Sequence, residues 1–137
     1  MIRILRSVVD DMIAHARSLA PVESCGYIAG TSTQMTRYIV MTNVDNSPDH
    51  FSFDPKEQFQ AVKSVRSTGE TLQVVVHSHP VTPARLSAED IRLFNDPQMI
   101  YLIVSLKEEP PIYNSFRVFK PAPGIVDIQP VVIQVVE

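Results

Sequence analysis

Near its start the chain places apolar residues at the spacing of one helix face. Between Ser7 and Ala20 these residues recur three or four positions apart, and charged side chains occupy the opposite face. Pro21 follows directly and would end a helix there. The pattern predicts an amphipathic helix over residues 7–20, preceded by a short strand at "MIRIL".

Stretches of strand length follow this helix. The segments "SCGYIAG" and "RYIVMTNV" are separated by the turn residues "GTSTQ", which predicts two neighbouring strands. The next segment, "NVDNSPDHFSF", is polar with two aromatic residues and shows neither a helical nor a strand period. We therefore expect a loop at residues 43–53.

A second helix is indicated by its start signals. Asp54 suits the N-cap, Pro55 suits the first helical position, and Glu57 is placed to complete a capping box. We expect this helix to run to about Ser67 and to end before Gly69. The residues predicted to face inward are Phe59, Val62 and Val65.

The second half of the chain begins with the apolar run "TLQVVV", which predicts a strand covered on both faces. Ser87 would then begin a helix that reaches about Asn95. Pro130 belongs at a sheet edge or a bulge. Late strands are predicted at "MIYLIVSL", "SFRVFK" and "IVDIQPVVIQVV". The order α-β-β-α-β-α-β-β-β predicts an α/β fold, a three-layer α-β-α sandwich around a mixed sheet.

Length, composition and charge narrow the class of protein. The 137 residues suffice for one domain, residues 1–137, and 45% apolar content is typical of a globular chain. The net charge of −3 includes no block of like charge, so we expect neither a nucleic-acid partner nor a membrane partner. Asp10 and Asp11 interrupt the first apolar stretch before it reaches signal-peptide length. With Cys25 as its one cysteine, the chain has no internal disulfide, and we expect a soluble, cytoplasmic protein.

The predicted buried strand ends in polar residues whose chemistry fits a metal site. His77 and His79 are two positions apart, so both imidazoles point to the same side of an extended strand. Asp90 supplies a carboxylate in the first turn of the next helix, where the helix dipole stabilises negative charge. Two imidazoles and one carboxylate can hold Zn²⁺ and leave a fourth position for water, as in hydrolases rather than in structural zinc sites.

Each of these residues also has a purely structural interpretation. A pair such as His77 and His79 can lie in a hydrogen-bonded turn, and Ser87 can be a helix N-cap and nothing more. Asp90 would then be the other member of the same capping box. Because all three interpretations would have to hold together at the end of one buried strand, we favour the metal site.

The spacing of these residues resembles a known signature. The sequence reads His77-Ser78-His79-Pro80, with seven residues between His79 and Ser87 and two between Ser87 and Asp90. This resembles the signature of the JAMM (MPN+) zinc metalloproteases, in which a glutamate lies far upstream of the histidines. Glu23, after the first helix and before a small-residue strand, matches that glutamate. The resemblance covers nearly the whole chain and implies the JAMM/MPN architecture, which is related to that of cytidine deaminases.

The resemblance implies a role for each residue of the signature. His77, His79 and Asp90 would hold the zinc ion. Glu23 would act as general base toward a water molecule, and Ser87 would stabilise the oxyanion. The implied reaction is hydrolysis of peptide or isopeptide bonds after ubiquitin-like domains.

The resemblance also suggests a class of substrate. Because the chain has no long insertions, we expect it to act on small prokaryotic ubiquitin-like or sulfur-carrier proteins with a C-terminal diglycine tail. The tail is expected to lie between the "NVDNSPDHFSF" and "VTPARL" loops, against Phe51 or Phe53. The oligomeric state is left open.

Other interpretations of the chain compete with this one. A zinc deaminase would carry a P-C-x-x-C sequence, which a chain with a single cysteine lacks. A non-catalytic MPN scaffold that binds partners is the main alternative, although such relatives typically lose signature residues. Cys25 has no partners for a thiol mechanism and is expected to be a small buried hydrophobe. His15 and His50 match no family position, although His50 would be placed to line a substrate groove.

Overall fold

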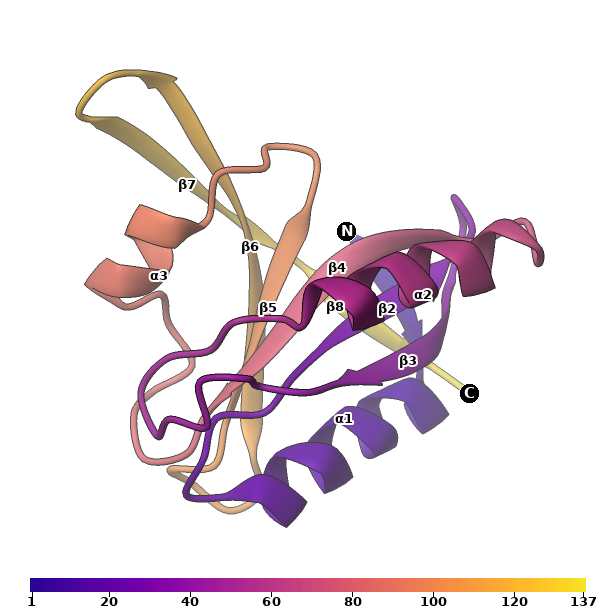
Figure 1. The fold of residues 1–137 in the computed structure, drawn as a ribbon, viewed down its shortest axis with the longest axis horizontal. Helices are drawn as coiled ribbons and strands as arrows, with labels where there is room; N and C mark the ends of the chain where they lie inside the picture. Colours follow the sequence, from indigo (N-terminus) through magenta and orange to yellow (C-terminus); the bar gives the residue numbers. More distant parts are fainter.

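The protein, described over all 137 residues by a computed structural model, is built on one eight-stranded mixed sheet. Its strands and helices are β1 (Ile2–Leu5), α1 (Arg6–Leu19), β2 (Cys25–Gly30), β3 (Met35–Met41), α2 (Pro55–Arg66), β4 (Thr71–His79), α3 (Ala88–Leu93), β5 (Ile100–Ser105), β6 (Ile112–Ala122), β7 (Ile125–Val131) and β8 (Ile133–Val136). The strand order is β7-β6-β5-β4-β2-β3-β1-β8. Figure 1 shows α1 and α2 on opposite faces of the sheet, so the predicted three-layer α/β fold is confirmed.

Both parallel and antiparallel pairs occur within this sheet. Strand β4 is parallel to β5, and β1 is parallel to both β3 and β8. The other neighbours are antiparallel, including β2 with β4. The predicted mixed sheet is therefore correct, and β4 lies near its middle.

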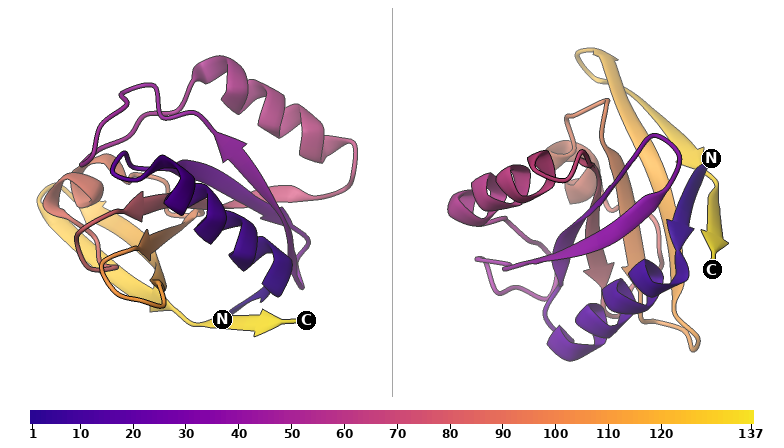
Figure 2. Two further views of the ribbon diagram at one scale, coloured as in Figure 1. Left: turned by 90° about the horizontal axis from the view of Figure 1, so that it is seen from below. Right: turned by 90° about the vertical axis from the view of Figure 1, so that its right-hand side faces the viewer.

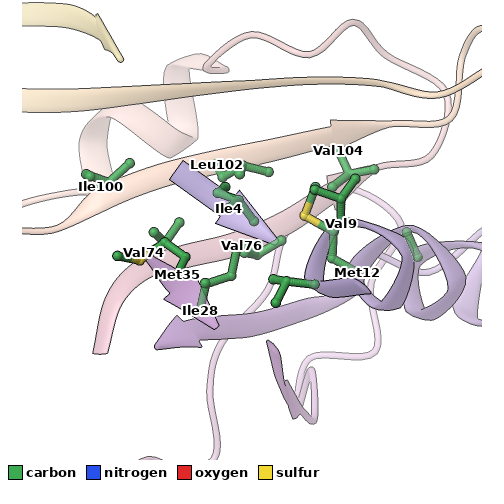
Figure 3. Packing of buried hydrophobic residues seen from close by; sticks show 12 residues of the cluster. Ile4, Val9, Met12, Ile28, Met35, Val74, Val76, Ile100, Leu102 and Val104 are labelled. Atoms are coloured by element: carbon green, nitrogen blue, oxygen red, sulfur yellow. The ribbon is translucent and has the colours of Figure 1, made fainter. Parts of the chain in front are cut away.

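The central strands supply the core on both faces of the sheet. Strands β2 and β5 are buried throughout, and β4 is buried from Val74 to His79. Val74 and Val76 pack toward α1, whereas Val75 packs toward α2. Figure 3 shows the α1 side, where Met12 of the helix meets these strands. Burial on both faces explains why the β4 sequence has no alternation of apolar and polar residues.

Helix α2 begins where the sequence indicates, with one difference in its hydrogen bonds. Asp54 caps the helix by accepting a hydrogen bond from the Lys56 amide, and Pro55 is its first residue. The capping box predicted for Glu57 is wrong. Its carboxylate instead accepts hydrogen bonds from the amide and the hydroxyl of Thr42, at 2.7 and 2.8 Å.

The inward face of α2 also differs from the prediction. Phe59 is 66% exposed and Val62 is 40% exposed, so of the three predicted residues only Val65 is buried. Ala61 and Val65, one helical turn apart, form the narrow buried seam, and the small Ala61 side chain lets the helix approach the sheet. Phe59 lies off this seam, with the Lys63 ammonium group 5.5 Å from its ring centroid.

The segment predicted as the last strand, "IVDIQPVVIQVV", forms two strands, which lie at opposite edges of the sheet. Strand β7 pairs with β6, strand β8 pairs with β1, and Val132 alone lies between them. One residue cannot cross a flat sheet in which neighbouring strands lie about 4.8 Å apart. The sheet therefore curls until its edge strands, β7 and β8, meet at Val132. Figure 2 shows β8 beside β1, the strand with which it pairs. Pro130 lies in the edge strand β7, as predicted.

The remaining differences from the sequence prediction concern the ends of elements. Helix α3 ends at Leu93 rather than near Asn95, and β6 extends beyond "SFRVFK" at both ends. The short strand predicted at "MIRIL" is present as β1. None of the three helices combines the length and the apolar character that crossing a membrane requires.

We expect Met12→Ala to lower the free energy of unfolding by about 2–5 kcal/mol, because truncating this fully buried side chain leaves a cavity beneath α1. Urea denaturation measures the change. Phe59→Ala is the control, and this exposed residue should change stability by less than about 0.5 kcal/mol. A larger effect at Phe59 than at Met12 would contradict the packing of α2 described above.

Candidate metal centre

Three side chains from two elements converge at the carboxyl end of β4. His77 and His79 lie on the same face of β4, and Asp90 lies in the first turn of α3. The Nε2 atoms of the two imidazoles are 3.1 Å apart. The distances from these atoms to the nearer oxygens of Asp90 are 3.2 Å for His77 and 3.1 Å for His79. All three residues are buried, so the structure brings together the three ligands predicted from the sequence.

The spacing of these atoms fits a metal ion. A tetrahedral ion with bonds of roughly 2.0–2.1 Å separates its ligand atoms by about 3.3 Å. The separation of the two Nε2 atoms, 3.1 Å, is close to this value. His77 lies 3.2 Å from Oδ1 of Asp90 and His79 lies 3.1 Å from Oδ2, so the carboxylate is within the same range of both imidazoles. Three protein ligands leave a fourth position open, which is the arrangement of catalytic sites rather than structural ones.

The hydrogen bonds and charges of the cluster also favour a cation. The Nδ1 atom of His79 lies 2.9 Å from the carbonyl oxygen of Pro83, which can only accept, so Nδ1 carries the hydrogen and Nε2 faces Asp90. Burial would raise the pKa of Asp90, but hydrogen bonds with His77 and His79 outweigh burial and hold the pKa well below its usual range. A permanent carboxylate is thus enclosed by two imidazoles, and the cluster attracts positive charge.

The two imidazoles respond differently to this carboxylate. Burial lowers the pKa of His77 and outweighs its hydrogen bond to Asp90, so this ring is neutral. Burial also opposes protonation of His79, but hydrogen bonds to Asp90 and Pro83 raise its pKa above the usual value. Of the two imidazoles, His79 is therefore the one whose protonated form the cluster favours.

Ser87 holds Asp90 in position through a complete capping box. The Ser87 hydroxyl accepts a hydrogen bond from the Asp90 amide at 3.0 Å, and the Ser87 amide donates to Asp90 Oδ2, also at 3.0 Å. The predicted N-cap is confirmed. The carboxylate that faces the imidazoles is therefore oriented by its own helix start.

Glu23 lies beside this cluster, shortly before a strand, as its sequence suggests. Strand β2 begins at Cys25, and Glu23 is in the segment that leads into it. The Glu23 side chain is buried, and its Oε1 atom has no hydrogen-bond partner. Burial raises the pKa of Glu23 to about 8, the positive charge of His79 opposes this rise, and the negative charge of Asp90 adds to it. Glu23 is thus electrostatically coupled to the predicted ligands.

Two residues that the sequence did not single out hold the Glu23 segment. The Asn43 side chain donates 3.0 Å hydrogen bonds to the carbonyl oxygens of Glu23 and His50, which ties the loop at residues 43–53 to this segment. The Ser78 hydroxyl accepts a 2.8 Å hydrogen bond from the Ser24 amide, and the Ser78 amide donates to the Ser24 carbonyl oxygen at 3.0 Å. The base candidate is therefore bonded to the strand that carries both histidines.

The sequence indicates that Ser78 needs a hydrogen-bond partner, but it gives no such indication for Asn43. A hydroxyl in the middle of a strand buried on both faces requires a partner, because an unpaired buried polar group is costly. Ser78 has no exposed surface and meets this requirement through Ser24. Asn43 is one of several polar residues in an irregular loop, and only the folded chain shows that it is buried.

Aromatic rings fix the orientation of His77. The Phe51 ring stacks on the imidazole at 4.9 Å with an interplanar angle of 25°, and the Phe94 ring meets it edge-on at 5.5 Å. The His77 Nδ1 atom has no hydrogen-bond partner. Packing therefore orients His77, whereas a backbone hydrogen bond orients His79.

The other histidines and the cysteine lie outside the ligand cluster. Cys25 is fully buried in the apolar cluster on the α2 side, and burial raises its pKa to about 12, so the thiol stays protonated at neutral pH. His15 pairs with the Tyr38 hydroxyl at 2.7 Å. His50 pairs with Asp45 at 3.1 Å and lines a cavity next to the cluster.

The sequence matches the Prok-JAB family, described as prokaryotic homologs of the JAB domain, over residues 5–119. The chain belongs to this family. The matched range spans the positions of the predicted signature, and the resemblance to JAMM proteins is confirmed.

Named relatives extend this assignment. A CysO-cysteine peptidase of Mycobacterium tuberculosis is 34% identical over 126 residues, which cover 90% of this chain and 85% of the relative. A desampylase of Haloferax volcanii is 32% identical over 103 residues, which cover 70% of this chain and 74% of the relative. With relatives named as peptidases, the chain is an enzyme of the JAMM type.

Solved structures agree with the fold. A protein of Desulfitobacterium hafniense, known from its solution structure, is 40% identical with a TM-score of 0.87, and the alignment covers 100% of this chain and 94% of that protein. A JAB1/MPN domain protein from Archaeoglobus fulgidus is 21% identical with a TM-score of 0.64 and coverage of 100% and 98%. The second likeness concerns the fold alone. Together they confirm the JAMM/MPN architecture expected from the sequence.

Ser78→Ala should lower the free energy of unfolding by about 1–3 kcal/mol, because the buried amide of Ser24 loses its partner. Chemical denaturation measures the loss. Ser18→Ala removes an exposed hydroxyl that bonds only within its own helix, and it should have little effect. Equal stability of the two variants would mean that the Ser78 hydroxyl does not anchor the Glu23 segment.

Proposed function

We propose that the protein is a zinc-dependent hydrolase that cleaves peptide or isopeptide bonds at the C-terminus of small ubiquitin-like or sulfur-carrier proteins. The observation that carries this proposal is the convergence of His77, His79 and Asp90 beside the unpartnered carboxyl group of Glu23. The names of the relatives, a CysO-cysteine peptidase and a desampylase, support the class of substrate.

Zinc is the metal that suits this ligand set best. Two imidazole nitrogens and one carboxylate oxygen at tetrahedral spacing are typical zinc ligands in hydrolases, and the open position admits water. When bound at such a site, zinc lowers the pKa of a water molecule toward about 7 and polarises the scissile carbonyl group. The residues of the chain must then move the protons and position the substrate.

Glu23 is placed to move the proton. Its carboxyl group is buried with a free oxygen, so it has capacity to accept a proton from water and to deliver it to the leaving nitrogen. Burial raises its pKa to about 8, and a cation held by the neighbouring ligands would bring this value down toward neutrality. A pKa near the working pH suits a group that both takes and gives a proton.

Ser87 is proposed to act on the oxyanion. Its hydroxyl oxygen accepts from the Asp90 amide, which leaves the hydroxyl hydrogen available to donate. Donation to the developing negative charge is compatible with the capping role, because the two roles use different atoms of the hydroxyl.

The proposed substrate carries a diglycine tail. An extended segment with small residues can approach a buried metal site closely, and we propose that it lies between the loops at residues 43–53 and 81–86. Phe51 and Phe53, expected at this groove, line the cavity beside the metal centre.

We also propose that the protein is cytoplasmic. Its single cysteine, Cys25, can form no internal disulfide, which agrees with a reducing compartment.

The purified protein should carry about one zinc ion per chain, since three protein ligands and one water complete a tetrahedral site. His77→Ala and His79→Ala should abolish binding, and Asp90→Ala should weaken it severely. Atomic absorption on dialysed protein measures the metal content. Retention of zinc at the wild-type level by all three variants would exclude this site, and a wild type without zinc would favour the non-catalytic scaffold.

The variant Glu23→Gln tests whether Glu23 acts as the general base or as a metal ligand. The amide keeps the size of the side chain but accepts no proton, so hydrolysis should fall about 10²- to 10⁴-fold while the zinc content stays unchanged. Turnover of a carrier-protein fusion and metal analysis on the same sample measure the two properties. Loss of zinc would make Glu23 a ligand, and unchanged turnover would make it a bystander.

Replacing the penultimate glycine of a cleaved substrate by valine should suppress turnover, because the branched side chain clashes in a narrow groove. Steady-state kinetics on the matched pair of substrates measures the effect. A change in the substrate is a cleaner test than Phe51→Asp, because the Phe51 ring stacks on His77 and its loss would also disturb a metal ligand. Equal cleavage of both substrates would favour a peptidase with a wide groove.

A further inference from the structure

A cavity of about 320 Å³ opens beside the metal centre, between α2, the central strands and α3. Most of its lining is apolar or aromatic, including Tyr27, Phe53, Val75, Leu93, Met99 and Tyr101. Its volume lies at the lower end of the roughly 300–1,000 Å³ that ligand pockets occupy. The function proposed above places the diglycine tail near Phe51 and Phe53 but assigns no part of the substrate to the rest of this cavity.

The cavity is continuous with the metal centre. Asp90 lines the cavity and is also a predicted metal ligand. Phe51 and Phe94 line it as well, and both rings pack on the imidazole of His77. A substrate group in the cavity would therefore be joined to the reacting bond by only a short length of chain.

The residues that border the cavity indicate which side of the scissile bond it serves. Glu23 and His79 are not among its lining residues, whereas Asp90 and two neighbours of His77 are. Since Glu23 must reach the leaving nitrogen, the leaving group occupies the Glu23 side of the cluster. The cavity then receives the acyl side, which is the tail of the carrier protein.

The polar groups around the cavity determine which kind of substrate side chain it can hold. The Tyr27 hydroxyl accepts a hydrogen bond from Gln58, and the Tyr101 hydroxyl accepts one from the Asp96 amide, so each oxygen already has one partner within the protein. The carboxyl groups of Glu89, Asp90 and Asp96 border the cavity, and no lysine or arginine lines it. An apolar side chain fits this environment, whereas a carboxylate would be repelled.

We propose that this cavity is a specificity pocket for a bulky apolar side chain of the substrate tail, upstream of the diglycine. The proposal rests on the proposed function and refines it, because the pocket would decide which carrier proteins are cleaved. Loss of a well-packed apolar side chain from such a pocket should weaken productive binding at least about tenfold.

The protein contains no tryptophan, and this permits a direct binding test. Zinc-loaded Glu23→Gln protein is titrated with tail peptides that end in diglycine and carry one tryptophan, moved through successive upstream positions. At one position the tryptophan emission should shift to the blue and the peptide should bind most tightly. Aspartate at that position should weaken binding at least about tenfold in a competition titration.

Two exposed apolar residues provide a matched pair of variants. Leu93 lines the cavity and is 48% exposed, whereas Val132 lies outside it and is 66% exposed. Leu93→Asp should abolish the blue shift and weaken binding, with zinc content unchanged, and Val132→Asp should do neither. The same blue shift in both variants would overturn the assignment of the cavity.

Kinetics on the wild-type enzyme separates this proposal from the one on which it rests. Replacing the apolar residue of a cleaved substrate by alanine should raise KM with little change in kcat, and Leu93→Asp should add no further loss on the alanine substrate. Cleavage with the same KM whatever residue is present would reject the specificity pocket and leave the hydrolase intact. Failure to bind or cleave any tail would reject both proposals.

Discussion

The buried carboxylate of Asp90 is the group on which the whole site depends. Removing an ion from water costs several kcal/mol unless hydrogen bonds or opposite charges compensate it. The Ser87 amide and two imidazoles surround this carboxylate, and both imidazoles belong to the buried part of β4. Because β4 is buried where it carries both histidines and the capping box orients the Asp90 carboxylate, the ligand atoms point toward one another.

The same requirement for buried polar groups organises the surroundings of the cluster. Glu23 is kept near His79 by hydrogen bonds to its main chain rather than to its carboxyl group. That arrangement leaves the carboxyl oxygen free for chemistry while Asn43 and Ser78 hold the backbone. Aromatic rings exclude water from one side of His77 and, on their other side, form the wall of the neighbouring cavity.

The sequence predicted the ligands well because their signals are local. The strand period places His77 and His79 on one side, and the helix-start residues place Asp90, so two short segments define most of the site. The inward face of α2 was not predictable in this way, because Phe59 and Val62 fit a helical period yet the sheet contacts only the seam at Ala61 and Val65. Tertiary packing decides which stripe of a helix is buried, and a single sequence does not contain that information. The division of the last strand at Val132 likewise depends on the curvature of the whole sheet.

The meeting of the two sheet edges at Val132 also governs how the chain acquires its structure during synthesis. Ile2 pairs with Ile133, so β1 and its partner strand β8 are far apart in the sequence. At a synthesis rate of roughly 5–20 residues per second, β1 waits about 7 to 26 seconds for β8. Over that interval the edge formed by β1 exposes unpaired backbone groups, which are a template for association with other chains. Closure of the sheet thus requires a pairing of high contact order that cannot form before residue 133 has been synthesised.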